Sequence, residues 1–191
     1  KIKVGLIFGG NSSEYEVSIM SAHNIYEEID TNKFDVYPMW ITNDGYLAND
    51  ADSRKVLDNP KMEVANPHKV ANISNIVELK DRPEIDVFFP IVHGNLGEDG
   101  CLQGLFRVLD KPFVGDDVLA AAVTMDKEMT KILAQRAGVP VAKWIAVKRF
   151  EYNDPDNEKL DYEYVASQLG SDLFVKPSNQ GSSVGVSHVT N

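Results

Sequence analysis

The chain has 191 residues, of which 43% are hydrophobic and 25% are charged, and its formal net charge is −10. This composition is typical of a folded globular protein and argues against a disordered tail. The acidic balance argues against a nucleic-acid partner, because binding a polyanion requires clustered Lys and Arg. Cys101 is the single cysteine, so no disulfide framework can form, and no Cys/His spacing indicates a zinc site.

The amino terminus opens directly into an apolar, strand-like run without the pattern of a signal peptide. No apolar run reaches the roughly 18 residues of a membrane span. We therefore expect a cytoplasmic protein that has no membrane partner. Lys1 is not an initiating Met, and we expect the natural protein to include residues before it.

The first half of the chain alternates short apolar runs with helical patterns, which is typical of a parallel sheet wrapped by helices. Val4–Phe8 and Phe34–Ile41 are predicted strands, and the second ends at the turn signal Asn43-Asp44-Gly45. The helix between them is predicted from apolar residues at spacings of three and four, which are Ile19, Ala22, Ile25, Tyr26 and Ile29.

The remainder of this half is less regular. Residues 49–82 are polar and weakly periodic, and we expect only short irregular elements there. Asp86–Val92 is a predicted buried strand, and residues 112–115 are a predicted short final strand. A helix between these strands is indicated by the spacing of Leu102, Leu105, Phe106 and Leu109. The pattern predicts an α/β fold with a doubly wound parallel sheet in an amino-terminal domain, residues 1–122.

A second, α+β domain is predicted over residues 123–191. Thr124 is the expected N-cap of a helix that ends at Gly138 and Pro140. The predicted elements that follow are strands at Ala142–Val147, Leu173–Lys176 and Val184–Val189 and a helix at Tyr162–Leu169. This sheet would be unfinished, so we expect the natural protein to continue beyond Asn191.

The loop Gly9–Ser18 joins the first strand to the first helix, where open α/β sheets commonly bind ligands. Its glycines do not follow the G-x-G-x-x-G dinucleotide pattern. Ser13 and Glu16 have the spacing of a capping box, and capping is the role that this segment by itself favours for Glu16. In the alternative, Glu16 pairs with a cationic amine held over the start of the helix.

The segment Pro90–Gly100 follows another strand at the same edge of the sheet. Its three glycines permit a close backbone approach that a simple linker would not need. His93 is either a buried, hydrogen-bonded residue or a ligand-binding one, and Asp99 could cap the next helix. We expect this loop and Gly9–Ser18 to form one ligand-binding edge.

Lys127 follows Met125-Asp126 near the start of a helix, where a cation is electrostatically unfavourable. This position indicates a partner, although an exposed lysine is the interpretation that the segment by itself favours.

The stretch Lys176–Gly185 places a lysine at a strand end before a loop rich in Gly and Ser. Backbone amides, Ser hydroxyls and a lysine can bind polyphosphate, and glycine allows close approach. The stretch lacks the Gly-Lys-Ser/Thr ending of a P-loop. The structural alternative is a flexible hairpin connection.

Together, four motifs resemble those of the D-alanine–D-alanine ligases of the ATP-grasp superfamily, in order and spacing over essentially the whole chain. They are Gly9-Gly10-x-Ser-x-Glu-x-Glu16-Val17-Ser18, His93-Gly94-x-x-Gly-Glu-Asp-Gly100-x-x-Gln-Gly104, Met125-Asp126-Lys127 and Lys176-Pro-x-x-x-Gly-Ser-Ser-Val-Gly185. The resemblance implies a substrate-binding amino-terminal domain followed by the first part of an ATP-grasp domain. It also implies an activity in peptidoglycan synthesis, in which two D-alanines are joined through an acyl phosphate at the expense of ATP.

In this family, Glu16 would bind the ammonium group of the first D-alanine and act as a catalytic residue together with Ser182. Val17, Ser18 and His93 would belong to the substrate site. The family motif often has His at the position of Tyr15, and we expect Tyr15 to face outward or to modulate the loop.

The resemblance further implies that Lys127, Lys176, Ser182 and Ser183 contact ATP. The family's Mg²⁺ ligands would lie beyond Asn191, so no metal ligand is assigned in this chain, and the chain is expected to be inactive by itself. The resemblance also implies a cytoplasmic homodimer.

The sequence also bears on three other functions. A D-alanine–D-lactate or D-alanine–D-serine ligase stays open, because the segment that selects the second substrate lies outside the chain. A non-catalytic small-molecule-binding α/β module would explain the first half but not the loop Lys176–Ser183. An NAD-dependent dehydrogenase is disfavoured by the glycine spacing and by the lack of an acidic residue ending the second strand.

Overall fold

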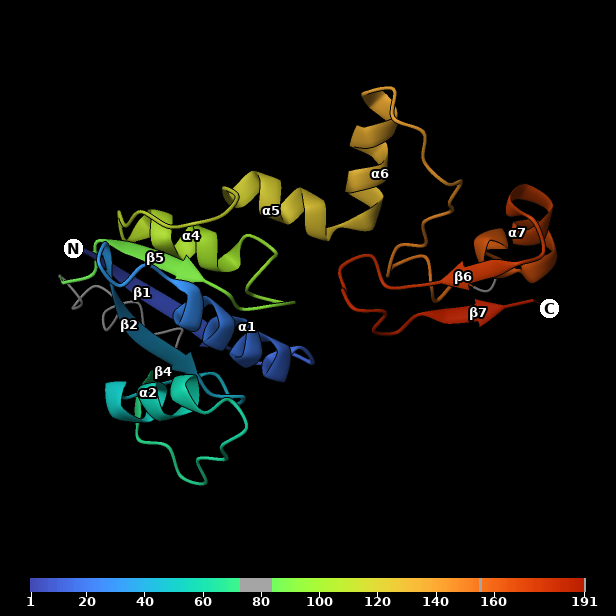
Figure 1. The fold of residues 1–191 in the computed structure, drawn as a ribbon. Coiled ribbons are helices and arrows are strands. Elements are labelled where there is room, and N and C mark those ends of the chain that lie inside the picture. Colours follow the sequence, from blue (N-terminus) through green and yellow to red (C-terminus); the bar gives the residue numbers. More distant parts are fainter. Residues whose placement is uncertain (73–83, 155, 191) are drawn as a thin grey trace. The chain divides into compact units, whose positions relative to one another are not determined.

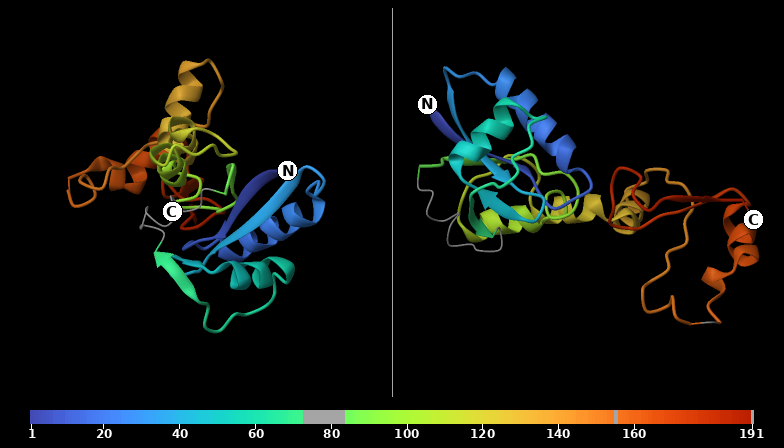
Figure 2. Two further views of the ribbon diagram at one scale, coloured as in Figure 1. Left: turned by 90° about the vertical axis from the view of Figure 1, so that its left-hand side faces the viewer. Right: turned by 90° about the horizontal axis from the view of Figure 1, so that it is seen from below.

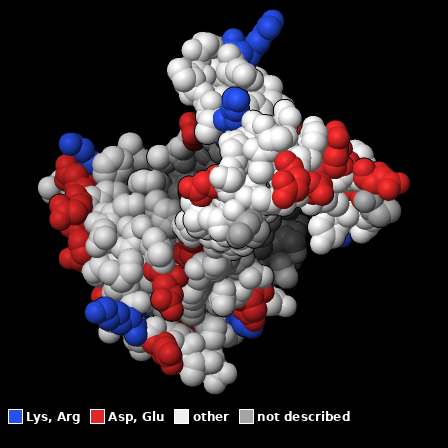
Figure 3. Space-filling view, turned by 90° about the vertical axis from the view of Figure 1, so that its right-hand side faces the viewer, with Lys and Arg blue, Asp and Glu red and all other residues white. Residues whose placement is uncertain are grey.

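A computed structural model describes residues 1–72, 84–154 and 156–190, and the chain divides into two compact units, Lys1–Ala122 and Val123–Asn191. Each unit is described by itself. No helix among these described residues is long and apolar enough to cross a membrane. Asp and Glu are spread more widely than Lys and Arg over the face drawn in Figure 3, in agreement with the net charge of −10.

The first unit is a five-stranded sheet in the order β4-β3-β2-β1-β5 (Figure 1). Its strands are β1 (Ile2–Gly9), β2 (Phe34–Ile41), β3 (Tyr46–Ala48), β4 (Lys69–Asn72) and β5 (Val87–Pro90). β1 is central and pairs in parallel with β2 and β5, in registers that begin at Ile2↔Phe34 and Val4↔Val87. β3 and β4 add antiparallel neighbours at one edge. The predicted α/β class is confirmed, and the sheet is mixed because the turn after β2 returns the chain as a hairpin.

Helices cover both faces of this sheet (Figure 1, Figure 2). They are α1 (Tyr15–Glu28), α2 (Asp50–Asp58) and α4 (Cys101–Val108), and α5 (Val118–Met125) follows them. Successive residues of β1 point to opposite faces, so Ile7 packs with Phe106 of α4 while Leu6 and Phe8 pack with Ile19 of α1. The two apolar clusters therefore fix α1 and α4 on opposite sides of the same central strand.

Several sequence predictions for this unit are confirmed. β2 has the predicted bounds, and the predicted faces of α1 and α4 are the ones that pack on the sheet. The predicted strand at 112–115 is reduced to one parallel bridge between Phe88 and Phe113. The expectation of only irregular elements in residues 49–82 was wrong for 50–58, because the Asn49 side chain caps a regular helix there. It was also wrong for 69–72, because these residues pair with β3 as strand β4. Residues 73–82 of that stretch lie outside the described residues.

The second unit contains α6 (Lys127–Arg136), the 3₁₀ turn η1 (Glu158–Leu160) and α7 (Tyr162–Leu169). Its strands, β6 (Leu173–Val175) and β7 (Ser187–Val189), pair as an antiparallel hairpin. α7 has the predicted bounds. The strand predicted at Ala142–Val147 was wrong, because a strand requires a neighbour to complete its hydrogen-bond ladder and none pairs with this segment among the described residues.

Thr124 was also wrongly predicted to be an N-cap. It lies inside α5, and the cap of the next helix is Asp126, whose carboxylate accepts hydrogen bonds from the backbone N–H groups of Glu128 and Met129 at 2.9 and 3.0 Å. One carboxylate oxygen, Oδ1, accepts both hydrogen bonds, and Asp is at least as effective an N-cap as Thr.

Gly9 ends β1 with φ at +88°, and a Cβ at this position would lie 2.1 Å from the carbonyl oxygen of Ile41. Gly9→Ala should therefore lower the free energy of unfolding of the first unit by about 2–4 kcal/mol. Urea denaturation followed by Trp40 fluorescence, in a Trp144→Phe background, measures this change.

Gly104→Ala is the matched control, because Gly104 lies within α4 and a Cβ there meets no atom within 4 Å. This second variant should be more stable than the parent by about 0.5–1 kcal/mol. Equal effects of the two substitutions would contradict the close packing deduced at Gly9.

Candidate active site

Side-chain hydroxyls of the first loop and α1 join that helix to the end of β5. Ser18 is fully buried; its hydroxyl accepts from the backbone N–H of Gly9 at 2.8 Å and donates to the carbonyl of Ile91. Ser12 donates to the carbonyl of His93 at 2.9 Å. The loops after β1 and β5 therefore meet at the carboxyl edge of the parallel strands, as the sequence predicts.

Glycines allow this meeting. A Cβ on Gly97 would lie 1.9 Å from the carbonyl oxygen of Val92, and one on Gly94 would lie 2.8 Å from a carboxylate oxygen of Glu14. Gly94 also has a φ of +76°, which favours glycine. The three-glycine connection is thus required by close approach of the chain to itself and to the first loop.

The capping-box interpretation of Glu16 was wrong. Ser12, not Ser13, provides the hydroxyl that accepts from a backbone N–H, that of Glu14 at 3.1 Å, and Glu14 occupies the N-cap position. Glu16 is exposed in the first turn of α1 and makes no hydrogen bond or ion pair with another described residue. Its carboxylate is available to a ligand at the positive end of the helix dipole.

Val17 and Ser18 differ sharply in accessibility. The Val17 side chain is 57% exposed next to Glu16, so it can contact a ligand. The Ser18 hydroxyl is buried, and its two hydrogen bonds leave no capacity for direct contact. In this structure Ser18 supports the site through the backbone of Gly9 and Ile91.

His93 is partly buried, with 25% of its side chain exposed. Its Nε2 lies 3.1 Å from the hydroxyl of Ser21 in α1, and its Nδ1 lies 3.6 Å from a carboxylate oxygen of Glu98. The other carboxylate oxygen of Glu98 accepts from the backbone N–H of Gly94 at 2.8 Å. His93 is therefore hydrogen-bonded within the fold, as one interpretation of the sequence expected, while a quarter of its side chain stays exposed.

Tyr15 was expected to face outward or to modulate the loop, and the outward orientation is wrong. Its ring packs against the core, and its hydroxyl accepts a hydrogen bond from Nε1 of Trp40 at 2.8 Å. Burial raises the pKa of the Tyr15 phenol, the Trp40 hydrogen bond opposes this, and the charge of Asp44 adds to it. Both rings line a pocket of about 330 Å³. The hydrogen bond between them fixes the start of α1 against β2.

Asp99 holds the end of the glycine loop before α4. Its carboxylate accepts from the backbone N–H groups of Leu96 at 2.9 Å and Cys101 at 3.0 Å. Partial burial by itself would raise the pKa of Asp99, but these hydrogen bonds outweigh burial and the pKa lies below its usual value. The same carboxylate raises the pKa of the Cys101 thiol, with burial adding to the effect.

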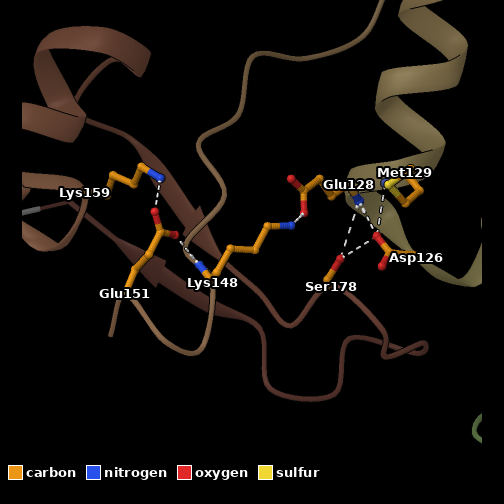
Figure 4. Close-up of polar contacts among 7 residues, drawn as sticks. All are labelled: Asp126, Glu128, Met129, Lys148, Glu151, Lys159 and Ser178. Carbon is orange, nitrogen blue, oxygen red and sulfur yellow. Dashed lines mark hydrogen bonds and ion pairs between the residues drawn. The ribbon is translucent and has the colours of Figure 1, made fainter. Parts of the chain in front are cut away.

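In the second unit, Lys127 has the partner that its position indicated. Its ammonium group donates to the backbone carbonyls of Gln180 and Ser178, and its backbone N–H donates to Ser178 at 3.0 Å. The Ser178 hydroxyl donates to Asp126 at 2.8 Å, as Figure 4 shows. The start of α6 therefore holds the first half of the loop Lys176–Gly185.

The tip of this loop is a tight turn closed by a hydrogen bond from the N–H of Val184 to the carbonyl of Gly181, 2.9 Å. Its central residues, Ser182 and Ser183, have φ of +45° and +60°, as a type I′ turn requires. Residues other than glycine rarely adopt this backbone conformation, which costs about 1–3 kcal/mol per residue. Such residues are concentrated at functional sites. Both serines are exposed, as is Lys176, whose ammonium has no partner among the described residues.

Two ion pairs of the second unit were missed from the sequence. Lys148 pairs with Glu128 of α6, and Lys159 pairs with Glu151 at 2.6 Å (Figure 4). The pair with Glu128 raises the pKa of Lys148, and the hydrogen bond from Lys159 lowers the pKa of Glu151. They join residues 8 and 20 positions apart, too far for a helical spacing to reveal.

Comparison with known proteins places these motifs in a family. Residues 3–116 match the family described as D-ala D-ala ligase N-terminus, and residues 133–191 match D-ala D-ala ligase C-terminus. The chain belongs to the D-alanine–D-alanine ligase family. The resemblance seen in the motifs is thereby confirmed.

The relatives are longer than the chain. It is 99% identical over 191 residues to a D-alanine–D-alanine ligase of Lactobacillus johnsonii and 75% identical to one of Lactobacillus acidophilus, covering 53% of each. Among solved structures, it resembles the VanG D-Ala:D-Ser ligase of Enterococcus faecalis (TM-score 0.80, 38% identity, 100% of this chain and 56% of that one). It also resembles the D-alanine–D-alanine ligase of Coxiella burnetii (TM-score 0.77, 31% identity, 100% and 57%). The chain thus spans about half the length of these ligases.

The buried hydroxyl of Ser18 predicts a measurable loss of stability. Ser18→Ala leaves the N–H of Gly9 and the carbonyl of Ile91 without their partner, so the free energy of unfolding should fall by about 1–3 kcal/mol per unsatisfied group. Ser13→Ala is the matched control; Ser13 is exposed, and its substitution should change stability by less than about 0.5 kcal/mol. Similar urea midpoints for the two variants would refute the role given to Ser18.

The cap at Asp126 predicts a titration on the acid side. The N–H of Met129 lowers the pKa of Asp126; burial opposes this, while Ser178, the N–H of Glu128 and Lys148 add to it. Since the folded-state pKa is depressed, the cap stabilises the helix fully above the ordinary value of 3.8 and is lost as pH falls through the folded-state pKa.

The amide resonances of Glu128 and Met129 should therefore titrate together by NMR, with a midpoint below 3.8. In Asp126→Asn, which keeps an N-cap side chain, this shared titration should disappear. A midpoint at or above the ordinary value would show that the carboxylate is not held as described.

Proposed function

We propose that this chain is part of an ATP-dependent ligase that joins two D-alanines, by way of an acyl phosphate, to make the D-alanyl-D-alanine dipeptide for peptidoglycan. The observation that carries the proposal is the joined edge at α1 and β5. Ser12 and Ser18 hold the start of α1, which carries Glu16, against the loop that carries His93. The match to D-alanine–D-alanine ligases over the whole chain supports the choice of substrate.

Glu16 and His93 suit a small zwitterion. An exposed carboxylate can pair with the ammonium of D-alanine, while an imidazole N–H can donate to its carboxylate. Val17 offers an exposed apolar surface for the methyl group. Orientation of this kind contributes to catalysis by holding the reacting carboxylate in place.

The turn Gly181–Val184 suits a polyphosphate. It presents Ser182 and Ser183 to solvent in left-handed conformations that follow one another, and the exposed Lys176 begins the same loop. In the proposal these three side chains contact ATP. Lys127 would do so by exchanging its carbonyl partners for phosphate oxygens, and Ser182 would serve as a second catalytic residue.

The family resemblance supplies the reaction sequence for the proposal. The first D-alanine's carboxylate attacks the γ-phosphate of ATP, so that ADP leaves and an acyl phosphate forms; the second D-alanine's amine then attacks the acyl carbon, and inorganic phosphate leaves. Lysines and hydroxyl donors stabilise charge on the phosphoryl group as it is transferred. No three His, Cys, Asp or Glu side chains gather to hold a metal in the parts of the chain that the structure describes. In the proposal, Mg²⁺ is held by residues of the longer ligase that this chain does not include.

The second substrate is the open question of specificity. D-serine has support from the 38% identity to the VanG D-Ala:D-Ser ligase, and D-lactate is the other alternative. We further propose a homodimer in the cytoplasm. ADP release with D-alanine, D-serine and D-lactate compared in turn, from the L. johnsonii ligase, identifies the second substrate, and sedimentation measures the dimer.

Lys176 provides the sharpest test of the nucleotide site. Lys176→Ala, introduced at the matching position of the L. johnsonii ligase, should weaken ATP binding about ten- to hundredfold, because a charge-assisted hydrogen bond contributes about 1.5–3 kcal/mol. Lys143→Ala removes another exposed lysine, which has no partner among the described residues, and should leave ATP affinity unchanged. Equal losses from both would point to general charge and would refute a specific site.

A further inference from the structure

Ser21 in α1 contacts a residue of the proposed substrate site but belongs to none of the roles assigned so far. Its hydroxyl lies 3.1 Å from Nε2 of His93, across 72 positions in sequence. Ser21 follows Val17 by four residues, so both lie on the same face of α1. The imidazole is therefore held against the helix face that also carries exposed Val17.

Glu98 approaches the other side of the ring. A carboxylate only accepts hydrogen bonds, and one of its oxygens is already fixed by the backbone N–H of Gly94 at 2.8 Å. The second oxygen lies 3.6 Å from Nδ1 of His93. Its negative charge favours a proton on Nδ1, which leaves Nε2 as the acceptor for the Ser21 hydroxyl.

The length of the Glu98 contact matters. At 3.6 Å it is longer than a hydrogen bond. The carboxylate therefore favours a hydrogen on Nδ1 by its charge but does not accept a hydrogen bond from it. Nε2, by contrast, is within hydrogen-bonding distance of Ser21. The backbone of His93 is fixed as well, because its carbonyl accepts from Ser12 at 2.9 Å.

We infer that Ser21 is a positioning residue: it donates to Nε2 of His93 and thereby makes Nδ1–H the edge that meets the ligand. If the proposed function holds, the acceptor at that edge is the carboxylate of the first D-alanine. Glu98 fixes the tautomer, and Ser21 fixes the ring orientation. Without the Ser21 hydroxyl, the ring can take up the other tautomer, can flip so that the two nitrogens change places, or can turn away from α1.

The first experiment records the ring nitrogens of ¹⁵N-histidine-labelled protein by NMR at a pH where His93 is neutral, with His93→Gln to assign the signal among the four histidines. In the unsubstituted chain the proton should reside on Nδ1. A proton on Nε2 would overturn the inference, and this measurement decides the matter even where a variant fails to fold.

Substitutions at Ser21 then test the hydroxyl itself. Ser21→Ala should shift the ring nitrogens toward a mixture of tautomers, and Ser21→Thr, which keeps the hydroxyl, should restore the parent spectrum. Ser13→Ala, in the loop before α1, is the matched control and should leave the ring unchanged. Identical His93 signals in the parent and in Ser21→Ala would overturn the role of Ser21.

Kinetics of the L. johnsonii ligase, substituted at the matching positions, connect the contact to the substrate. Ser21→Ala should raise KM for D-alanine about two- to tenfold, the range expected for one neutral hydrogen bond, with a smaller change in kcat. In a His93→Phe background the same substitution should have no further effect, and an undiminished effect there would overturn the inference. If D-alanine supports no ADP release at all, the proposed function fails while the NMR result on Ser21 stands by itself.

Discussion

The carboxyl ends of β1 and β5 lie at one edge of a parallel sheet, and the backbone groups there must find partners. Ser18 meets this requirement by accepting from Gly9 and donating to Ile91, which ties α1 to both strand ends. Because an unsatisfied buried polar group is costly, the position of α1 is fixed relative to the edge. Everything that α1 presents at its first turn, Glu16 above all, depends on that attachment.

The same helix organises the loop after β5. Ser12 holds the carbonyl of His93 and Ser21 holds its ring, while the glycines at 94 and 97 let the loop fold closely upon the first loop and upon itself. The Glu16 carboxylate on α1 and the His93 imidazole on the loop after β5 are thus brought to one edge by hydrogen bonds in which Glu16 itself takes no part. Such support leaves Glu16 exposed and available to a ligand.

The second unit is held together differently. Among its described residues Leu173 is the one buried large apolar side chain, and α6 and α7 bury none. Polar contacts take a larger share: Asp126 binds Ser178, Lys127 binds loop carbonyls, and Lys148 binds Glu128. These contacts fix the start of the Gly- and Ser-rich loop to α6, and the strained turn at Ser182 and Ser183 extends from that attachment.

The sequence determined the α/β class, the bounds of β2 and α7, and the apolar faces of α1 and α4, because these depend on periodicity over neighbouring residues. It also indicated that the loops after β1 and β5 would meet.

The sequence could not determine which serine hydroxyl makes which hydrogen bond. Ser13 had the local spacing of a cap, but it is the Ser12 hydroxyl that accepts from the N–H of Glu14. Ser12 is held there because it donates to the carbonyl of His93, 81 positions away in sequence. Tyr15 could not be placed either, since its partner Trp40 lies in β2, 25 positions away in sequence. Ala142–Val147 had the composition of a strand but found no neighbour among the described residues. In each case local spacing reveals only contacts within an element, whereas hydrogen bonds between distant segments arise once the sheet has brought those segments together.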